Sequence, residues 1–132
     1  MKVLFVCSGN AFRSPVAEAL LRKLRPDIKV DSAGVHPVIP VAESAWRYLA
    51  VEGAEEFLKE DPEGLNGKDI DQYDLIVTME QRHRDVVLSM CPSCEGKTVV
   101  WNIDDPYFLP PERAERVYNQ IKERVAELAK SL

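Results

Sequence analysis

Short strand-like runs alternate with helix-like stretches along the chain, and this alternation limits the possible folds more than any other feature. Runs of apolar and β-branched residues predict strands at residues 2–6, 28–32, 74–78 and 97–101. The longer stretches between and after them predict helices at residues 15–24, 41–52, 80–90 and 112–130. Because this alternation is typical of parallel strands with right-handed crossovers, we predict an α/β three-layer sandwich in which helices flank a four-stranded parallel sheet.

The size of the chain and its remaining segments fit one domain. With 132 residues the chain matches the usual size of a single domain, so we expect residues 1–132 to form one. Residues 54–72 are acidic and contain proline and glycine, which predicts a loop with one or two helical turns. Residues 102–111 contain three prolines and predict a second loop.

Charge, hydropathy and cysteine content exclude several classes of protein. The net charge of −5 argues against a nucleic-acid partner, which needs a basic surface. No apolar run approaches the roughly 20 residues that a membrane span needs. The first residues enter a strand-like run directly, without the pattern of a signal peptide. Three cysteines are too few for a disulfide framework. We therefore expect a cytoplasmic protein with no membrane partner.

The loop after the first predicted strand carries most of the chemistry. Cys7 ends that strand, and a helix begins near Ser14. Between them lie Gly9 and Asn10, the residue types best suited to left-handed dihedral angles. A loop bent in this way turns its N–H groups inward as an anion site, and the positive end of the following helix adds to the field. The spacing therefore predicts an oxyanion site above Cys7.

Two further side chains of this loop fit the same chemistry. Arg13 lies at the rim, and its planar guanidinium matches a tetrahedral oxyanion. The field of the site stabilises a thiolate at Cys7, and the Ser14 hydroxyl can donate a hydrogen bond to that sulfur. A thiolate beneath an oxyanion site, next to a fixed arginine, predicts nucleophilic attack on phosphorus.

The string VLFVCSGNAFRSPVAEAL resembles the opening of the low-molecular-weight protein tyrosine phosphatases. It also resembles the opening of the thioredoxin-coupled arsenate reductases that share their fold. The resemblance continues through residues 31–34, 73–80 and 105–107 and extends over nearly the whole chain. It implies a phosphotyrosine phosphatase I-like fold and metal-free hydrolysis of a phosphomonoester without a cofactor. The implied substrate is a phosphotyrosine protein or a small aryl phosphate.

The resemblance also implies a role for each residue of the loop. Cys7 is implied as the nucleophile and Arg13 as the phosphate clamp, while Asn10 and Ser14 support the loop and the thiolate. Backbone N–H groups of the intervening residues are implied to hold the phosphate, namely Ser8, Gly9, Asn10, Ala11 and Phe12. The family often has a second cysteine where this chain has Phe12, so a protective disulfide between that position and the nucleophile is absent here.

A proton donor for the leaving group is expected after the fourth strand. Pro106 holds the residue before it in an extended conformation, and the resemblance selects that residue, Asp105, as the general acid. Asp104 is expected to be a solvated or capping carboxylate. The resemblance further implies that aromatic side chains line the substrate mouth. Tyr107 is assigned there, with Phe108 either beside it or in the core, and Phe12 is expected to extend the wall.

Cys91 and Cys94 leave a second hypothesis open. In the arsenate reductases of this fold, oxidation passes from the nucleophile to two later cysteines, and thioredoxin reduces them. Cys91 and Cys94 lie in the corresponding region, so the alternative function is thioredoxin-coupled arsenate reduction with Cys7. The simpler interpretation is a turn at a helix end with two thiols that have no role. The remaining cysteine and histidines lack ligand spacing, so no metal site is expected.

Two residues complete the predictions from sequence. We expect His83 to be exposed on its helix, and we place His36 near the rim of the site without a role. A third function, a phosphate-binding module without catalysis, is disfavoured because binding alone needs neither Cys7 nor Asp105.

Overall fold

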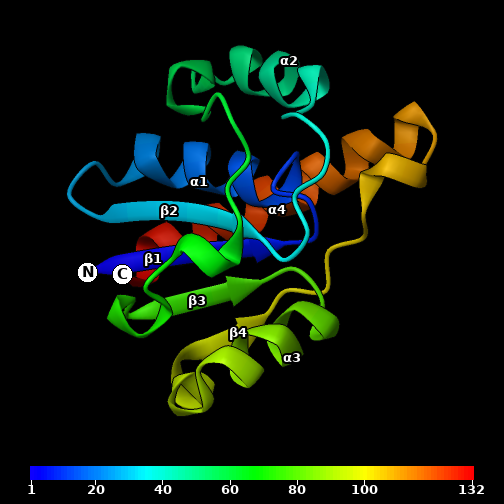
Figure 1. Ribbon diagram of the computed structural model, residues 1–132. Coiled ribbons are helices and arrows are strands. Elements are labelled where there is room, and N and C mark those ends of the chain that lie inside the picture. The colour runs from blue at the N-terminus through cyan, green and yellow to red at the C-terminus, as the bar shows by residue number, and fades with distance from the viewer.

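A computed structural model describes residues 1–132, except for the side chain of Phe108. Its centre is a parallel sheet with the strand order β2-β1-β3-β4 (Figure 1). The strands are β1 (Lys2–Cys7), β2 (Lys29–Gly34), β3 (Leu75–Thr78) and β4 (Thr98–Val100). Strand β1 lies inside the sheet, and its apolar residues 3–6 are completely buried. This burial on both faces explains why the strand reads as a continuous apolar run.

The helices form a layer on each face of the sheet, which confirms the predicted three-layer sandwich (Figure 1). They are α1 (Arg13–Leu24), α2 (Glu43–Val51), α3 (Gln81–Met90) and α4 (Pro111–Ser131). One core contains Val3 and Phe5 of β1 together with buried residues of α1, α2 and α4. The other contains Leu4 and Val6 together with Val87 of α3. Successive side chains of a strand point to opposite faces, so β1 supplies both cores.

A short connection joins β1 to α1. Strand β1 reaches Cys7 and helix α1 begins at Arg13, so the connection between them is only residues 8–12. We call residues 8–12 the Cys7 loop. The middle segment 54–72 contains three short 3₁₀ turns, Glu55–Phe57, Leu65–Gly67 and Ile70–Gln72. A further 3₁₀ turn, Pro92–Lys97, follows α3.

Backbone hydrogen bonds bring the loops together at the carboxyl ends of the strands. The amides of Val35 and His36 donate to the carbonyl oxygens of Cys7 and Ser8, at 3.0 and 2.8 Å. The amide of Ile103 donates to the carbonyl oxygen of Met79 at 2.8 Å. The segments that follow β1, β2, β3 and β4 therefore meet at one edge, where parallel α/β sheets bind ligands. Both termini lie at the opposite end of the sheet (Figure 1).

The structure corrects the sequence predictions for residues in and directly after α3. Cys91 and Cys94 form a disulfide, which corrects the simpler of the two interpretations that the sequence left open, that of two free thiols. Both belong to the core beneath α3, and their Cα atoms are 5.4 Å apart. His83 is completely buried, whereas we expected it on the exposed face of α3. Among the described residues, no helix combines the length and the apolar character that crossing a membrane requires.

Candidate active site

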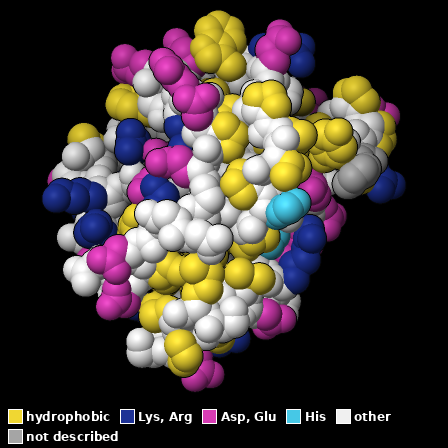
Figure 2. Space-filling view, viewed as in Figure 1, with side chains coloured by type: hydrophobic (Ala, Val, Ile, Leu, Met, Phe, Trp, Pro, Cys, Tyr) yellow, Lys and Arg dark blue, Asp and Glu magenta, His cyan; other side chains and the backbone are white. Residues whose placement is uncertain are grey.

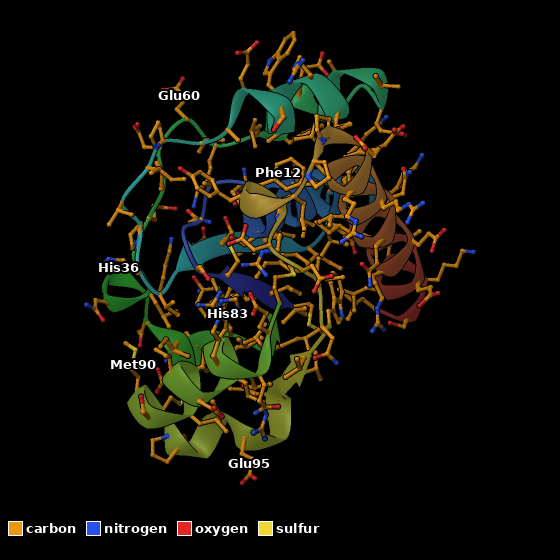
Figure 3. All side chains as sticks on the ribbon, turned by 90° about the vertical axis from the view of Figure 1, so that its right-hand side faces the viewer. Phe12, His36, Glu60, His83, Met90 and Glu95 are labelled. Carbon is orange, nitrogen blue, oxygen red and sulfur yellow. A yellow bond between two sulfur atoms is a disulfide. The ribbon has the colours of Figure 1, made fainter. Side chains whose placement is uncertain are left out.

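A cavity of about 620 Å³ opens at the carboxyl edge of the sheet. Figure 3 looks onto this edge, with Phe12, His36 and His83 around it. The Cys7 loop and its neighbours form the floor, with Cys7, Ser8, Gly9, Ala11, Phe12 and Arg13. The walls come from the segments after β2 and β4, with His36, Val38, Ile39, Asp105 and Tyr107. The structure thus brings together every predicted catalytic residue around one space.

The sulfur of Cys7 is buried at the floor of the cavity. Only 2% of Cys7 is exposed, and its Sγ lies 2.9 Å from Oγ of Ser14. Ser14 Oγ accepts a hydrogen bond from Nδ2 of Asn10 at 2.8 Å. Because this bond occupies a lone pair of the hydroxyl oxygen, the hydroxyl proton is left for the sulfur. Asn10 and Ser14 therefore form a chain of hydrogen bonds that ends at the Cys7 sulfur.

Asn10 is the structural centre of the loop. Its φ of 52° lies in the left-handed region that asparagine tolerates better than most residues. Its Nδ2 also donates to Ser32 Oγ, at 2.9 Å, and its Oδ1 accepts from Lys59 Nζ and from the amide of Glu63, both at 2.8 Å. The buried side-chain amide therefore makes four hydrogen bonds, two donated by Nδ2 and two accepted by Oδ1, and these fix its orientation.

The backbone amides of the Cys7 loop are available to a ligand. Among the hydrogen bonds of the described residues, none is donated by the amides of residues 8–12. The loop lines the cavity and leads into the amino end of α1. Unpaired N–H groups and the positive end of a helix together favour an anion at this place.

Arg13 is held in place from two directions. Its Nη1 donates to Oε2 of Glu80 at 2.6 Å and to the carbonyl oxygen of Ile103 at 2.7 Å. Partial burial raises the pKa of Glu80, but hydrogen bonds from Arg82 and Arg13 outweigh it and lower the pKa to about 2. The carboxylate thus stays charged and anchors a guanidinium that is only 2% exposed. The other terminal nitrogen of the guanidinium, Nη2, lies on the cavity side, 3.4 Å from Oγ of Ser8.

Asp105 faces this free side of the guanidinium. Its Oδ2 lies 3.6 Å from Nη2 of Arg13, and its Oδ1 accepts from the amide of Tyr107 at 3.0 Å. The second bond caps the 3₁₀ turn Pro106–Phe108 and holds the carboxyl group at the cavity wall. Asp104 is exposed and does not line the cavity, as expected for a solvated carboxylate.

His83 reaches the site from α3. Its Nδ1 accepts from the amide of Glu80 at 3.1 Å, and its Nε2 lies 2.8 Å from Oγ of Ser8. Burial, together with the nearby Arg13 guanidinium, lowers the pKa of His83 to about 4. The side chain is therefore neutral near pH 7.

The mouth of the cavity is mainly apolar. Val38 and Tyr107 are 68% and 66% exposed, and Ile39 lies beside them on the rim. Figure 2 shows hydrophobic side chains gathered on this face, next to the histidines. Phe12 lines the cavity, but its ring also packs edge-on against Tyr48 with 6.1 Å between centroids. The prediction for Phe108 lies outside the described side chains.

Sequence reasoning missed the residues that support the loop from other parts of the chain. Lys59 and Glu63 come from the segment 54–72, for which the sequence predicted a loop with one or two helical turns but no contact with the site. Glu80 and His83 form a capping box, in which the third helical residue bonds back to the residue before the helix. The usual signature of a capping box is Ser or Thr followed by Glu or Gln, so this pair of residue types gave no such signal in the sequence. Among the described residues, no cluster of three or more His, Cys, Asp or Glu side chains is placed to hold a metal ion.

Comparison with known proteins identifies the family. Residues 2–132 match the model for low molecular weight phosphotyrosine protein phosphatases. The chain belongs to the low molecular weight protein-tyrosine phosphatase family. The predicted resemblance, fold and enzyme class, a phosphoric monoester hydrolase, are thereby confirmed. The match supports the phosphatase hypothesis and not the arsenate reductase alternative.

Individual relatives cover almost the full length of this phosphatase. The low molecular weight protein-tyrosine-phosphatase Etp of Escherichia coli K12 is 35% identical, over 98% of this chain and 93% of its own. Wzb of Vibrio vulnificus, solved in complex with benzylphosphonate, is 30% identical with a TM-score of 0.88, over 99% of this chain and 98% of its own. The YwlE arginine phosphatase of Geobacillus stearothermophilus is 27% identical with a TM-score of 0.87, over 98% of this chain and 91% of its own.

Proposed function

We propose that residues 1–132 form a single catalytic domain that hydrolyses phosphotyrosine by way of a cysteinyl-phosphate intermediate. The observation that carries this proposal is the convergence of three groups on one cavity. Cys7 lies at its floor, the Arg13 guanidinium is beside it, and the Asp105 carboxyl is on its wall. A phosphate group that occupies the cavity would meet a nucleophile, a clamp and a proton donor at once.

The first step transfers the phosphoryl group to the enzyme. The thiolate of Cys7 attacks phosphorus in line with the leaving oxygen, forming an S–P bond as the P–O bond breaks. The loop amides and Arg13 bind the equatorial oxygens, on which negative charge is spread in the transition state. Protonated Asp105 gives its proton to the departing phenoxide, so the product leaves as a phenol.

The second step returns the enzyme to its starting state. Asp105, now a carboxylate, takes a proton from water as the water oxygen attacks phosphorus. The S–P bond breaks, inorganic phosphate leaves, and the thiolate of Cys7 is restored. The Ser14 hydroxyl, 2.9 Å from the sulfur, stabilises the thiolate as leaving group. No metal or cofactor takes part in either step.

The shape of the mouth favours an aryl phosphate. A phenyl ring attached to the bound phosphate would leave the cavity between the apolar 35–39 segment and Tyr107. Aromatic and aliphatic walls stabilise a ring by burial and by stacking. The Vibrio vulnificus relative that binds benzylphosphonate holds a compound of the same kind. A phosphotyrosine protein or a small aryl phosphate is therefore the substrate class that we propose.

Turnover of p-nitrophenyl phosphate in the presence of EDTA tests the reaction. We expect full activity with EDTA and no measurable activity in Cys7→Ser, because the hydroxyl is a far weaker nucleophile at neutral pH. A requirement for added metal would contradict the proposal, as would normal activity in Cys7→Ser. Phosphotyrosine, phosphoserine and phosphoarginine peptides are compared on the same sample, since one relative is an arginine phosphatase. We expect phosphotyrosine to be the preferred substrate.

The role of Asp105 is tested with leaving groups of different acidity. In Asp105→Asn, kcat/KM should fall strongly for phenyl phosphate but much less for p-nitrophenyl phosphate, because kcat/KM reports the first step and nitrophenoxide leaves without protonation. Asp104→Asn is the matched control and should behave like wild type. Equal losses on both substrates in Asp105→Asn would overturn the assignment.

An assay for arsenate reduction with thioredoxin tests the alternative function. The disulfide Cys91–Cys94 belongs to the core on one face of the sheet, and Cys7 to the core on the other. Cys91 follows the ten-residue helix α3, whose opposite end is at the site. A helix of that length spans about 15 Å. We therefore expect no thioredoxin-dependent consumption of NADPH with arsenate.

A further inference from the structure

A completely buried histidine makes contact with the floor of the phosphate site. His83 is 0% exposed although it is polar, and it lies on α3, outside the Cys7 loop. Its Nε2 is 2.8 Å from Oγ of Ser8, which lines the cavity next to Cys7. Neither the nucleophilic attack nor the proton transfer described above uses this side chain.

The hydrogen bonds of His83 define its tautomer. Nδ1 accepts from the backbone amide of Glu80 at 3.1 Å, so Nδ1 carries no proton. In a neutral imidazole the proton then lies on Nε2, since the bond at one nitrogen sets the state of the other. Nε2–H therefore donates to Oγ of Ser8. The amide of Glu80 cannot reverse its role, so this direction is fixed by the backbone.

The direction of that bond decides where the Ser8 hydroxyl can send its own proton. Besides His83, the neighbour of Ser8 Oγ is Nη2 of Arg13, at 3.4 Å. A guanidinium has donors and no acceptor, and Nε2 of His83 already carries a proton. Both neighbours therefore donate toward the hydroxyl oxygen. Among the described residues, no acceptor is bonded to the hydroxyl proton of Ser8, which leaves the cavity as its target.

We propose that His83 is a positioning residue that orients the Ser8 hydroxyl as an additional side-chain donor to the phosphoryl oxygens. This proposal rests on the proposed phosphatase function and adds a donor to the backbone amides and Arg13. His83 does not touch the substrate. Its Nε2–H donates to a lone pair of Ser8 Oγ, so that the hydroxyl proton stays directed into the site.

A double-mutant cycle tests the proposal. Ser8→Ala removes the donor, and we expect kcat/KM for p-nitrophenyl phosphate to fall about 10-fold, as for one hydrogen bond to a charged group. His83→Leu keeps a similar volume but cannot orient Ser8, and we expect about a 5-fold fall by the same principle. Because His83 acts only through Ser8, the double variant should be no slower than Ser8→Ala alone.

Two further measurements separate positioning from a structural role. His83→Gln keeps an amide donor for Ser8 and suits the third position of a capping box, so it should recover most of the loss seen in His83→Leu. The inhibition constant for inorganic phosphate should rise in Ser8→Ala and in His83→Leu. The pH at which Cys7 becomes half reactive toward iodoacetamide should stay at the wild-type value, because the donor serves the phosphate and not the sulfur.

Clear results would overturn the proposal. If the fall in kcat/KM of the double variant equalled the product of the two single falls, His83 would act independently of Ser8. A shift in the pH dependence of Cys7 alkylation would show that the hydroxyl serves the sulfur. Failure of His83→Gln to recover activity would show that donation to Ser8 is irrelevant. Ser89→Ala, on the exposed side of α3, is the matched control and should be unaffected. If the wild-type protein itself showed no phosphatase activity, by contrast, the proposed phosphatase function would be contradicted.

Discussion

The Cys7 loop and the segment 54–72 contribute to the same site in opposite ways. The loop presents backbone amides to the cavity and leaves them without partners in the chain. The segment 54–72 presents charged side chains to the back of the loop. Lys59 bonds to Asn10 Oδ1 at 2.8 Å and to the carbonyl oxygen of Ser32 at 2.9 Å.

This difference shows how an anion site keeps its shape. Amides that are free to bind phosphate cannot hydrogen-bond within their own loop, so the loop cannot hold its conformation alone. The restraint comes from outside the loop. Lys59 and Glu63 bond to the side chain of Asn10, and Gly34 of β2 lies against the loop backbone. The first two predictions below each remove one external support and leave the residues of the loop unchanged.

Gly34 provides the support with the largest expected effect. A Cβ atom at this position would lie 2.7 Å from the carbonyl oxygen of Ser8 and 2.8 Å from the amide nitrogen of Asn10. Because both are backbone atoms, the loop itself must move in Gly34→Ala. We expect kcat/KM to fall about 100-fold, as for an ångström-scale displacement in an active site. Gly67→Ala, with no atom within 4 Å, is the control and should retain activity.

Lys59 provides the second support. Lys59→Met keeps most of the side chain but removes the donor to Asn10 and a cation 4.0 Å from the buried Glu18. We expect about a 10-fold loss of kcat/KM and about 2 kcal/mol lower free energy of unfolding. Urea denaturation and steady-state kinetics measure the two effects. Lys122→Met breaks an ion pair at the surface and should cost well under 1 kcal/mol. Equal effects in the two variants would contradict the distinction.

Acidification tests the support from α3. His83 titrates at about 4 in the folded protein and near 6.5 when unfolded, so the unfolded state binds more protons between these values. The free energy of unfolding should therefore fall as the pH drops from 6.5 to 4, by up to about 3 kcal/mol. The variant His83→Gln has no side chain at this position that titrates in this pH range. Urea unfolding at several pH values should show a steeper loss in wild type, and parallel curves would contradict the burial of a neutral histidine.

The disulfide gives the smallest expected effect on activity. Cys91 and Cys94 are three residues apart and lie in the core beneath α3, far along the helix from the site. We expect the double variant Cys91→Ala, Cys94→Ala to keep kcat/KM within about twofold of wild type, because none of the supports of the loop changes. Its melting temperature should fall, since a covalent link is lost. A large loss of activity would show that this end of α3 is coupled to the site.

The residues of the site differ in how far the sequence could predict them. Cys7, Arg13 and Ser14 lie in one short string whose spacing indicates their chemistry. Lys59 and His83 meet their partners over separations of 49 and 75 residues, so no local pattern pairs them. Strands β1 and β3 could be predicted because burial on both faces makes them continuous apolar runs. The contacts of the segment 54–72 with Asn10 could not be predicted, because they join residues about 50 positions apart in the chain.

Trapping of the intermediate tests the central claim most directly. In Asp105→Asn the water that releases the phosphate lacks its base, while p-nitrophenyl phosphate can still transfer its phosphoryl group to the enzyme. Rapid quenching followed by mass spectrometry of the peptides should show a phosphoryl group on Cys7 in a large share of the molecules. Continued release of nitrophenol and phosphate with no phosphoryl group on Cys7 would contradict covalent catalysis by this residue.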